Sequence, residues 1–179
     1  MTSHPSVVRV VFTDTNILIN LLHLGRLDLL GALRGFEFIV PEPVANELVL
    51  PEQADGLQRA ALDGHVAIEP LTDLGELEQF AELRLVMGDG EAACLAMAVR
   101  RGAIVATSDR KPKFLREARR LLGEGRLMNL TGLLVLAIRQ GAITLEDADG
   151  YKAVLERNRY RLNFRSFRDV LGEPHEDKE

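Results

Sequence analysis

Apolar residues along this chain occur either in short continuous runs or in longer stretches with helical spacing. The first run, residues 7–13, consists of β-branched and aromatic side chains broken only by Arg9, and it ends at Asp14. A strand that is apolar on both faces is typical of a parallel sheet covered by helices. The pattern therefore predicts a central strand that carries a carboxylate at its carboxyl end.

Further apolar runs predict four more strands, and amphipathic stretches between them predict helices. The strands are expected at residues 36–40, 66–69, 103–107 and, more weakly, 126–128. The helices are expected at residues 17–22, 27–33, 53–62, 74–86, 91–101, 113–122, about 130–140, 145–158 and 166–171, with one more directly after residues 41–43. This alternation favours an α/β fold, a three-layer α/β/α sandwich around a parallel sheet of four or five strands.

Length and composition fit one globular domain. With 179 residues, we expect a single domain over residues 1–171, including a helical extension at about 142–171, and a disordered tail at 172–179. No apolar run is long enough to cross a membrane and the first residues lack a signal-peptide pattern, so a cytoplasmic location is expected. The single cysteine, Cys94, lies among apolar residues and is interpreted as a buried thiol.

Charge is divided unevenly along the chain. The net charge is -5, but residues 1–99 carry -10, residues 100–171 carry +8 and the tail carries -3. A chain divided in this way can present a basic surface to phosphates beside an acidic pocket. Solvated arginine-rich helices would give the same totals, so both interpretations stay open.

Four acidic residues follow strands or begin helices in a way that brings them to one edge of the sheet. Asp14 and Asp109 each follow an apolar strand, whereas Glu47 and Glu91 lie in the first turns of helices. Grouped carboxylates repel one another, and a hard divalent cation such as Mg²⁺ or Mn²⁺ removes that repulsion. Each acid alone has a simpler explanation, such as helix capping by Asp14 or Asp109.

A bound divalent cation could activate water for phosphodiester hydrolysis. The sequence shows no other motif for binding a metal or a phosphate. Its four histidines have no zinc-ligand spacing, and no glycine-rich phosphate-binding loop ends in Lys-Ser or Lys-Thr.

The acidic residues lie in four segments that resemble the motifs of PIN-domain nucleases, in the same order. These segments are residues 14–18, 43–48, 90–96 and 106–109. The resemblance covers about residues 7–141 and implies a sheet of order 3-2-1-4-5. It also implies Mg²⁺- or Mn²⁺-dependent cleavage of RNA, frequent homodimers, and often a role as the toxin of a toxin–antitoxin pair with a cognate antitoxin protein.

Carried over to this chain, the resemblance assigns metal binding and catalysis to Asp14, Glu47, Glu91 and Asp109. It assigns the orientation of these acids to Asn16 and Thr107. The chain is longer than the compact toxins, and its residues 145–171 lie beyond their usual end. This length, together with the segments Gly90-Glu91-Ala92 and Thr131-Gly132-Leu133, resembles a PIN-like subgroup with a C-terminal extension. Two groups of basic residues could contact RNA phosphates. The first is Arg110, Lys111, Lys113, Arg116, Arg119 and Arg120, and the second is Arg157, Arg159, Arg161, Arg165 and Arg168.

Two other functions remain open at the level of sequence. A haloacid-dehalogenase-type phosphatase also carries an Asp after its first strand, but it needs a second Asp two residues later, where this chain has Asn16. A catalytically silent PIN-like module would bind nucleic acid or protein through the same basic helices without cleaving anything.

Overall fold

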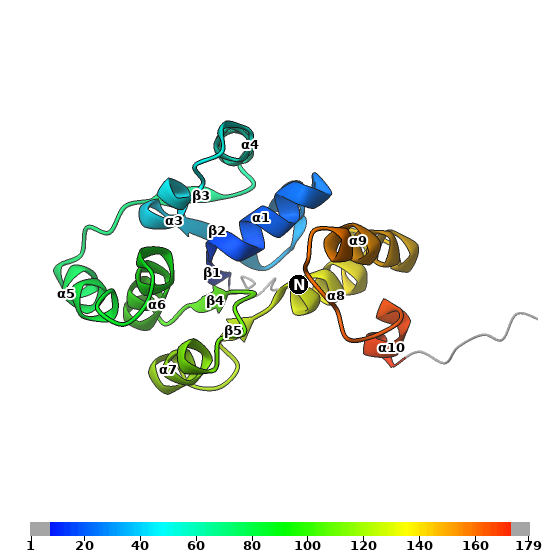
Figure 1. Cartoon of the computed structure of the whole chain (residues 1–179). Helices are drawn as coiled ribbons and strands as arrows, with labels where there is room; N and C mark the ends of the chain where they lie inside the picture. The colour runs from blue at the N-terminus through cyan, green and yellow to red at the C-terminus, as the bar shows by residue number, and fades with distance from the viewer. Residues whose placement is uncertain (1–7, 173–179) are drawn as a thin grey trace, which may run out of the picture.

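The computed structural model describes residues 8–172, and its centre is a five-stranded parallel sheet (Figure 1). The strands follow the order β3-β2-β1-β4-β5, which confirms both the predicted α/β fold and the predicted strand order. Their bounds are β1 (Arg9–Thr13), β2 (Phe36–Pro41), β3 (Ala67–Glu69), β4 (Ile104–Ala106) and β5 (Leu127–Met128).

Helices connect the strands and continue beyond the last of them. Their bounds are α1 (Thr15–Leu24), α2 (Asp28–Ala32), α3 (Glu42–Glu47), α4 (Pro51–Leu62), α5 (Leu74–Leu83), α6 (Asp89–Arg101), α7 (Pro112–Leu122), α8 (Leu130–Arg139), α9 (Leu145–Arg157) and α10 (Phe167–Leu171). Within residues 8–172, no helix is long and apolar enough to span a membrane.

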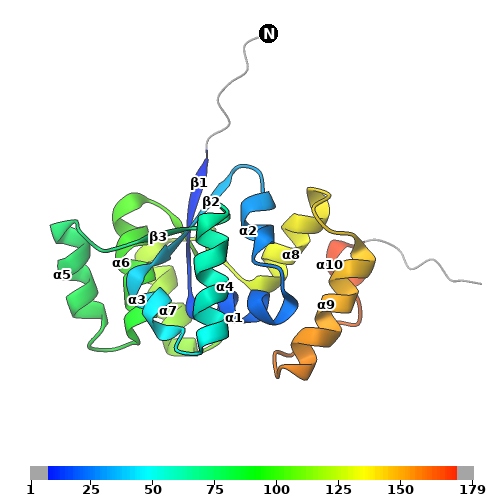
Figure 2. The same ribbon diagram turned by 90° about the horizontal axis from the view of Figure 1, so that it is seen from above.

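The helices form layers on the two faces of the sheet. Helices α5, α6 and α7 pack side by side on one face, and α1 lies on the other face between α4 and α9 (Figure 1). Helices α8, α9 and α10 contact one another and lie at the opposite end of the molecule from α5 (Figure 2). The predicted C-terminal extension is thus placed against α1, whose N-terminus follows Asp14.

The core forms where the central strands meet the alanine-rich helix α6. Val11 and Phe12 of β1 are fully buried, as is every residue from Ala92 to Ala98. Small side chains allow this helix to approach the sheet closely, so α6 contacts β1, β2 and β4. Cys94 is in this buried segment, and burial raises the pKa of its thiol.

Several helix ends match the sequence pattern and one does not. Thr144 and Asp147 form the expected reciprocal cap at the start of α9. The predicted helix 74–86 ends earlier, at Leu83, and the side chains of Leu85 and Val86 that extended its apolar pattern are exposed. Gly172 caps α10, and the rest of the predicted tail, residues 173–179, lies outside the described residues.

A buried carboxylate links the outer helix α5 to α6. The side chain of Glu76 is only 2% exposed, and its Oε1 lies 2.6 Å from Nε of Arg101. Arg101 also pairs with Glu69 of β3 at 2.7 Å and stacks over the ring of Phe12. One guanidinium therefore joins α5, α6 and the sheet, and without it Glu76 would be a buried charge with its main partner missing.

We expect Arg101→Ala to lower the free energy of unfolding by about 3 kcal/mol, because the buried Glu76 carboxylate loses its counterion. Urea denaturation measures this value. The neighbouring Arg100 is the matched control: its pair with Asp73 spans 3.7 Å and both side chains are about half exposed. Arg100→Ala should cost less than about 1 kcal/mol, and equal losses in the two variants would contradict the role of Glu76.

Candidate active site

Asp14 lies where the central strand β1 passes into helix α1, and it is almost completely buried. Its backbone N–H donates to the carbonyl of Ala106 at 2.9 Å, which continues the β1–β4 ladder by one residue. Its carboxylate caps α1 by accepting from the N–H of Thr15 at 2.7 Å. The simple explanation of Asp14 as a helix cap is therefore correct, but that bond uses only one of its two oxygens.

The second oxygen of Asp14 is connected to Asp109 through one hydroxyl group. Thr107 Oγ1 donates to Asp14 Oδ2 at 3.1 Å and accepts from the backbone N–H of Asp109, also at 3.1 Å. Thr107 follows the neighbouring strand β4 and is buried. This hydroxyl therefore joins the carboxylate of Asp14 to the backbone of Asp109, and the orienting role of Thr107 stays a prediction.

Glu47, the last residue of α3, joins the N-termini of two other helices. Its carboxylate accepts from the hydroxyl of Thr15 in α1 and, at 2.8 Å, from the backbone N–H of Gly90 in α6. A side chain on Gly90 would collide with it, since a Cβ there would lie 2.7 Å from Glu47 Oε1. A larger residue at position 90 would therefore displace the Glu47 carboxylate from its place in this structure.

Glu91 and Asp109 share a lysine. Lys111 Nζ lies 3.0 Å from Glu91 Oε1 and 3.0 Å from Asp109 Oδ2, and the backbone N–H of Lys111 donates to the other oxygen of Asp109. Glu91 also accepts a long bond from the backbone N–H of Gly88 at the start of α6. The two carboxylates are 13% and 5% exposed, whereas the lysine side chain is 70% exposed.

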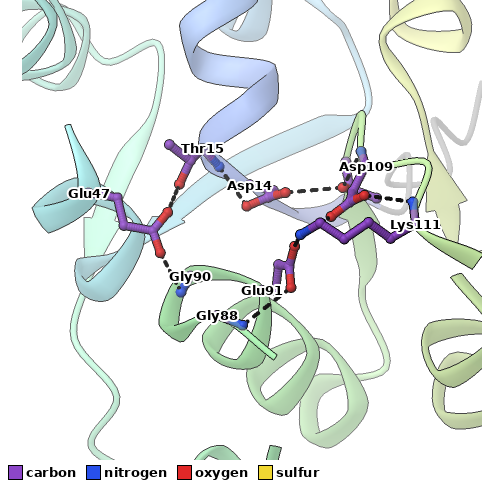
Figure 3. A network of polar contacts seen from close by, with 9 residues as sticks. Asp14, Thr15, Glu47, Gly88, Gly90, Glu91, Asp109 and Lys111 are labelled. Carbon is purple, nitrogen blue, oxygen red and sulfur yellow. Dashed lines mark hydrogen bonds and ion pairs between the residues drawn. The ribbon is translucent and has the colours of Figure 1, made fainter. Parts of the chain in front are cut away.

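Together these contacts and the peptide linkage between Gly90 and Glu91 form a circuit, which we call the acidic ring. In order, the acidic ring contains Asp14, Thr15, Glu47, Gly90, Glu91, Lys111, Asp109 and Thr107. All four acids predicted from the sequence belong to it (Figure 3). They come from four separate segments, and they meet at the carboxyl edge of the sheet.

The electrostatics of the acidic ring are those of crowded carboxylates. Burial raises the pKa of Asp14 from 3.8 to about 6, and repulsion from Glu47 and Asp109 adds to the increase against the bonds from Thr15 and Thr107. Burial also raises the pKa of Glu91, with a further contribution from Asp109 that Lys111 opposes. The bonds to Asp109 and Glu91 raise the pKa of Lys111, so this side chain remains an ammonium.

The predicted support and RNA-binding residues occupy different positions around the acidic ring. Among the described contacts, the exposed side chain of Asn16 makes no hydrogen bond to any of the four acids; it lines a cavity of about 520 Å³ beside Asp109. Lys113 and Arg116 line a second cavity, of about 360 Å³, together with Glu91 and Lys111. Arg110 instead stacks over the ring of Tyr160 and donates to the carbonyl of Arg161 at 2.8 Å.

Sequence reasoning missed two of the groups that hold the acidic ring together. Thr15 was not connected with Glu47, although it directly follows Asp14 and carries a hydroxyl on the first residue of a helix. Lys111 was assigned to phosphates, whereas its ammonium lies between two of the acids. A lysine side chain is long and flexible, so the sequence does not indicate whether it will contact a nearby acid or a phosphate of a ligand.

The donor chemistry of the acidic ring suits a hard divalent cation, because every candidate ligand is a carboxylate oxygen. The pKa of Asp14 is raised mainly because the carboxylate is buried, with repulsion from Glu47 and Asp109 as a smaller cause, and a bound cation would oppose both effects. Over residues 8–172, however, no three acidic, histidine or cysteine side chains converge closely enough to coordinate one ion. Lys111 balances part of the charge in this arrangement.

A parallel 3-2-1-4-5 sheet with acids from four ordered motifs at its carboxyl edge is the architecture of a PIN domain. The sequence matches the model of the family DUF3368, described as a PIN domain, over residues 10–176. This match covers most of the chain, so the protein belongs to that family, and the recognition made from the motifs is confirmed. A search among curated proteins gave no match.

We expect Asp14→Asn to stabilise the metal-free protein at pH 7–8. The folded-state pKa of Asp14 is about 6 against an ordinary 3.8, so its ionisation opposes folding. This cost to the free energy of unfolding is absent when the pH is below the ordinary pKa of 3.8, and it grows as the pH rises from there to the folded-state pKa of about 6. At higher pH the cost is complete and amounts to about 1–3 kcal/mol. The amide oxygen of asparagine can still cap α1, and its N–H can donate to Thr107. The variant should therefore retain the fold without the cost of ionising a buried carboxyl group.

Urea denaturation in EDTA, repeated between pH 4 and pH 8, measures this effect. The stability difference between variant and wild type should increase as the pH rises. Asp55→Asn removes the same formal charge at an exposed position of α4 and serves as control. A difference for Asp14→Asn that does not change with pH, or that falls as the pH rises, would contradict the raised pKa.

Proposed function

We propose that this protein is a divalent-metal-dependent endoribonuclease that hydrolyses RNA phosphodiester bonds. The observation that carries the proposal is the acidic ring, in which four carboxylates are held together at the carboxyl edge of the sheet. Membership of a PIN-domain family supports the same activity. Crowding four acids without a ligand is unfavourable, and fixed carboxylates beside basic cavities suit a metal ion and a phosphate.

Asp14, Glu47, Glu91 and Asp109 would hold Mg²⁺ or Mn²⁺ after Lys111 leaves Glu91 and Asp109 and the acidic side chains move closer together than they lie in the described structure. When bound, the ion would lower the pKa of a coordinated water and stabilise negative charge on a phosphoryl oxygen. The protein's own contribution is to fix the carboxylates. Thr107 orients Asp14 against Asp109, whereas the hydroxyl of Thr15 and the N–H of Gly90 orient Glu47.

Basic residues near the acidic ring would hold the RNA. Lys113 and Arg116 line the cavity that borders Glu91, and Arg110 follows directly after Asp109. Guanidinium and ammonium groups bind phosphate oxygens through charge-assisted hydrogen bonds. Lys111 would act twice: it neutralises two acids when no metal is bound, and it becomes available for a phosphate when it is released.

In its specific form, the proposal makes this protein the toxin of a type II toxin–antitoxin module that acts in the cytoplasm. Its partners would then be an RNA substrate, a cognate antitoxin and a second copy of the chain as a homodimer. The toxin role rests on the family resemblance. Growth arrest on expression without the antitoxin would test it.

A catalytically silent PIN-like module is the second candidate, and one specific observation favours it. The ammonium of Lys111 lies between Glu91 and Asp109, so part of the charge that would attract a metal is already balanced. A phosphatase of the haloacid dehalogenase type has no such support. The position of its second Asp is occupied by Asn16, which makes no described contact with the acids.

We expect the purified protein to cleave labelled single-stranded RNA with Mn²⁺ or Mg²⁺ and to stop when EDTA is added. Asp14→Asn and Asp109→Asn should each reduce the cleavage rate by at least about a hundredfold, because each removes a carboxylate for the ion. Gel electrophoresis of end-labelled RNA measures both effects. Asp55→Asn should cleave like the wild type.

RNA binding that persists in EDTA, without cleavage under any divalent metal, would favour the silent module instead. Hydrolysis of a small phosphate ester that Asp14→Asn abolishes, with RNA left intact, would favour the phosphatase.

We further expect Lys111→Met to bind Mn²⁺ about tenfold more tightly than the wild type. The variant removes a positive charge about 3 Å from two of the proposed ligands, so the ion no longer competes with an ammonium. Titration calorimetry measures the affinity without depending on catalysis. The side chain is exposed, so methionine should fold normally.

Lys113→Met is the matched control, because it removes the same charge from the same surface but has no contact with either acid in the described structure. If the affinity for Mn²⁺ changed equally in the two variants, the effect of Lys111 would come from its charge alone and not from its contacts with Glu91 and Asp109. Weaker binding in Lys111→Met alone would overturn the idea of competition.

A further inference from the structure

The extension beyond the acidic motifs forms one wall of a cleft that begins at Asp109. A cavity of about 520 Å³ lies between the exposed side of α1 and the segment that follows α9. Ser108, Asp109 and Lys111 line it at the acidic ring. The opposite wall, which we call the arginine wall, consists of residues 158–161, Asn158-Arg159-Tyr160-Arg161.

The charge in this cleft is strongly positive. Arg110, Lys111, Arg159 and Arg161 line it, against a single carboxylate, that of Asp109. In the described part of the chain, no acid pairs with the exposed guanidinium of Arg159 or of Arg161. Unpaired guanidinium groups that face a cavity next to the acidic ring suit an anionic ligand that extends from that ring.

The arginine wall is fixed in place. The guanidinium of Arg110 lies 5.2 Å from the centre of the Tyr160 ring, and it donates to the carbonyl of Arg161 at 2.8 Å. The next residue, Leu162, is buried in the core. Because Arg110 directly follows Asp109, one side chain joins the acidic ring to the arginine wall.

Arg159 has a backbone conformation that is unfavourable for its type. Its φ is +66°, and among residues 8–172 every other residue with a positive φ is a glycine. Left-handed backbone immediately after a helix usually selects glycine or asparagine. Here an arginine occupies the position, and its exposed side chain lines the cleft.

We propose that this cleft binds the phosphate backbone of single-stranded RNA beside the cleaved bond, with Arg159 and Arg161 as its contacts. The inference rests on the proposed ribonuclease function, which it extends from the acidic ring to the path of the substrate. It also gives the C-terminal extension a role in substrate binding. Arg157 and Arg165 belong to the same basic segment but do not line the cleft, so the proposal separates them from Arg159 and Arg161.

The test measures RNA affinity separately from cleavage. Fluorescence anisotropy with labelled single-stranded RNA is carried out in EDTA, using the Asp14→Asn background so that the RNA stays intact. Adding Arg159→Ala and Arg161→Ala together should weaken binding about 10- to 100-fold and reduce the salt slope by about 1.4, because two phosphate contacts are lost. The pair Arg157→Ala and Arg165→Ala removes the same charge and should have little effect.

A third variant separates binding from folding. Arg159→Gly suits the left-handed backbone, so its melting temperature should equal or exceed that of the wild type while its RNA affinity falls. Unchanged affinity in Arg159→Ala/Arg161→Ala, or equal weakening in the two double variants, would overturn the cleft proposal. Absence of cleavage by the wild-type protein would instead overturn the ribonuclease function, so the two failures are distinguishable.

Discussion

The parallel pairing of β1 with β4 is the constraint on which the candidate site depends. Thr13 lies opposite Ala106 in this pairing, and the ladder continues through the bond from Asp14 to the carbonyl of Ala106. The two strands therefore end level, and whatever follows them must meet at the same edge of the sheet. The hydroxyl of Thr107 then joins the carboxylate of Asp14 to the backbone N–H of Asp109, so the pairing of two strands brings the two acidic residues close together.

Bringing the carboxylates together costs electrostatic free energy, and the four acids receive different kinds of stabilising contact. Backbone N–H groups and threonine hydroxyls stabilise Asp14 and Glu47, but they carry no full positive charge. Lys111 supplies the full charge only at Glu91 and Asp109, from a side chain that is 70% exposed. Because an exposed side chain leaves its partners more easily than a buried one, Lys111 can both balance Glu91 and Asp109 and be displaced from them.

The fold could be predicted from the sequence because its signals are repetitive. Each strand is a short run made up mainly of apolar residues, and the order of the elements leaves few topologies once parallel strands require right-handed crossovers. The convergence of Asp14 and Asp109 follows from the same logic. The exact end of α5 could not be predicted, because the exposed Leu85 and Val86 extend an apolar pattern that the helix does not follow.

The contacts within the site were less predictable, for reasons of side-chain chemistry. The bond from Thr15 to Glu47 and the fit of Gly90 against Glu47 depend on how α3 meets α6, which no local pattern encodes. Lys111 could reach acids or phosphates equally well. The left-handed Arg159 is the hardest case, since the usual sequence signal for that conformation is a glycine.

The acidic and basic parts of the chain lie next to each other in the folded protein. The acidic part of the sequence supplies Asp14, Glu47 and Glu91, whereas the basic part supplies Lys111 and the arginines of the cleft. Asp109 belongs to the basic part of the chain, yet it lies at the point where the two meet. The basic surface can attract a polyanion from a distance. The positive potential of this surface decreases toward the carboxylates, where a phosphate would be repelled unless a cation were added. Under the proposed ribonuclease function, substrate binding and metal binding would therefore be interdependent, because neither charge distribution alone could hold a phosphate against the acidic ring.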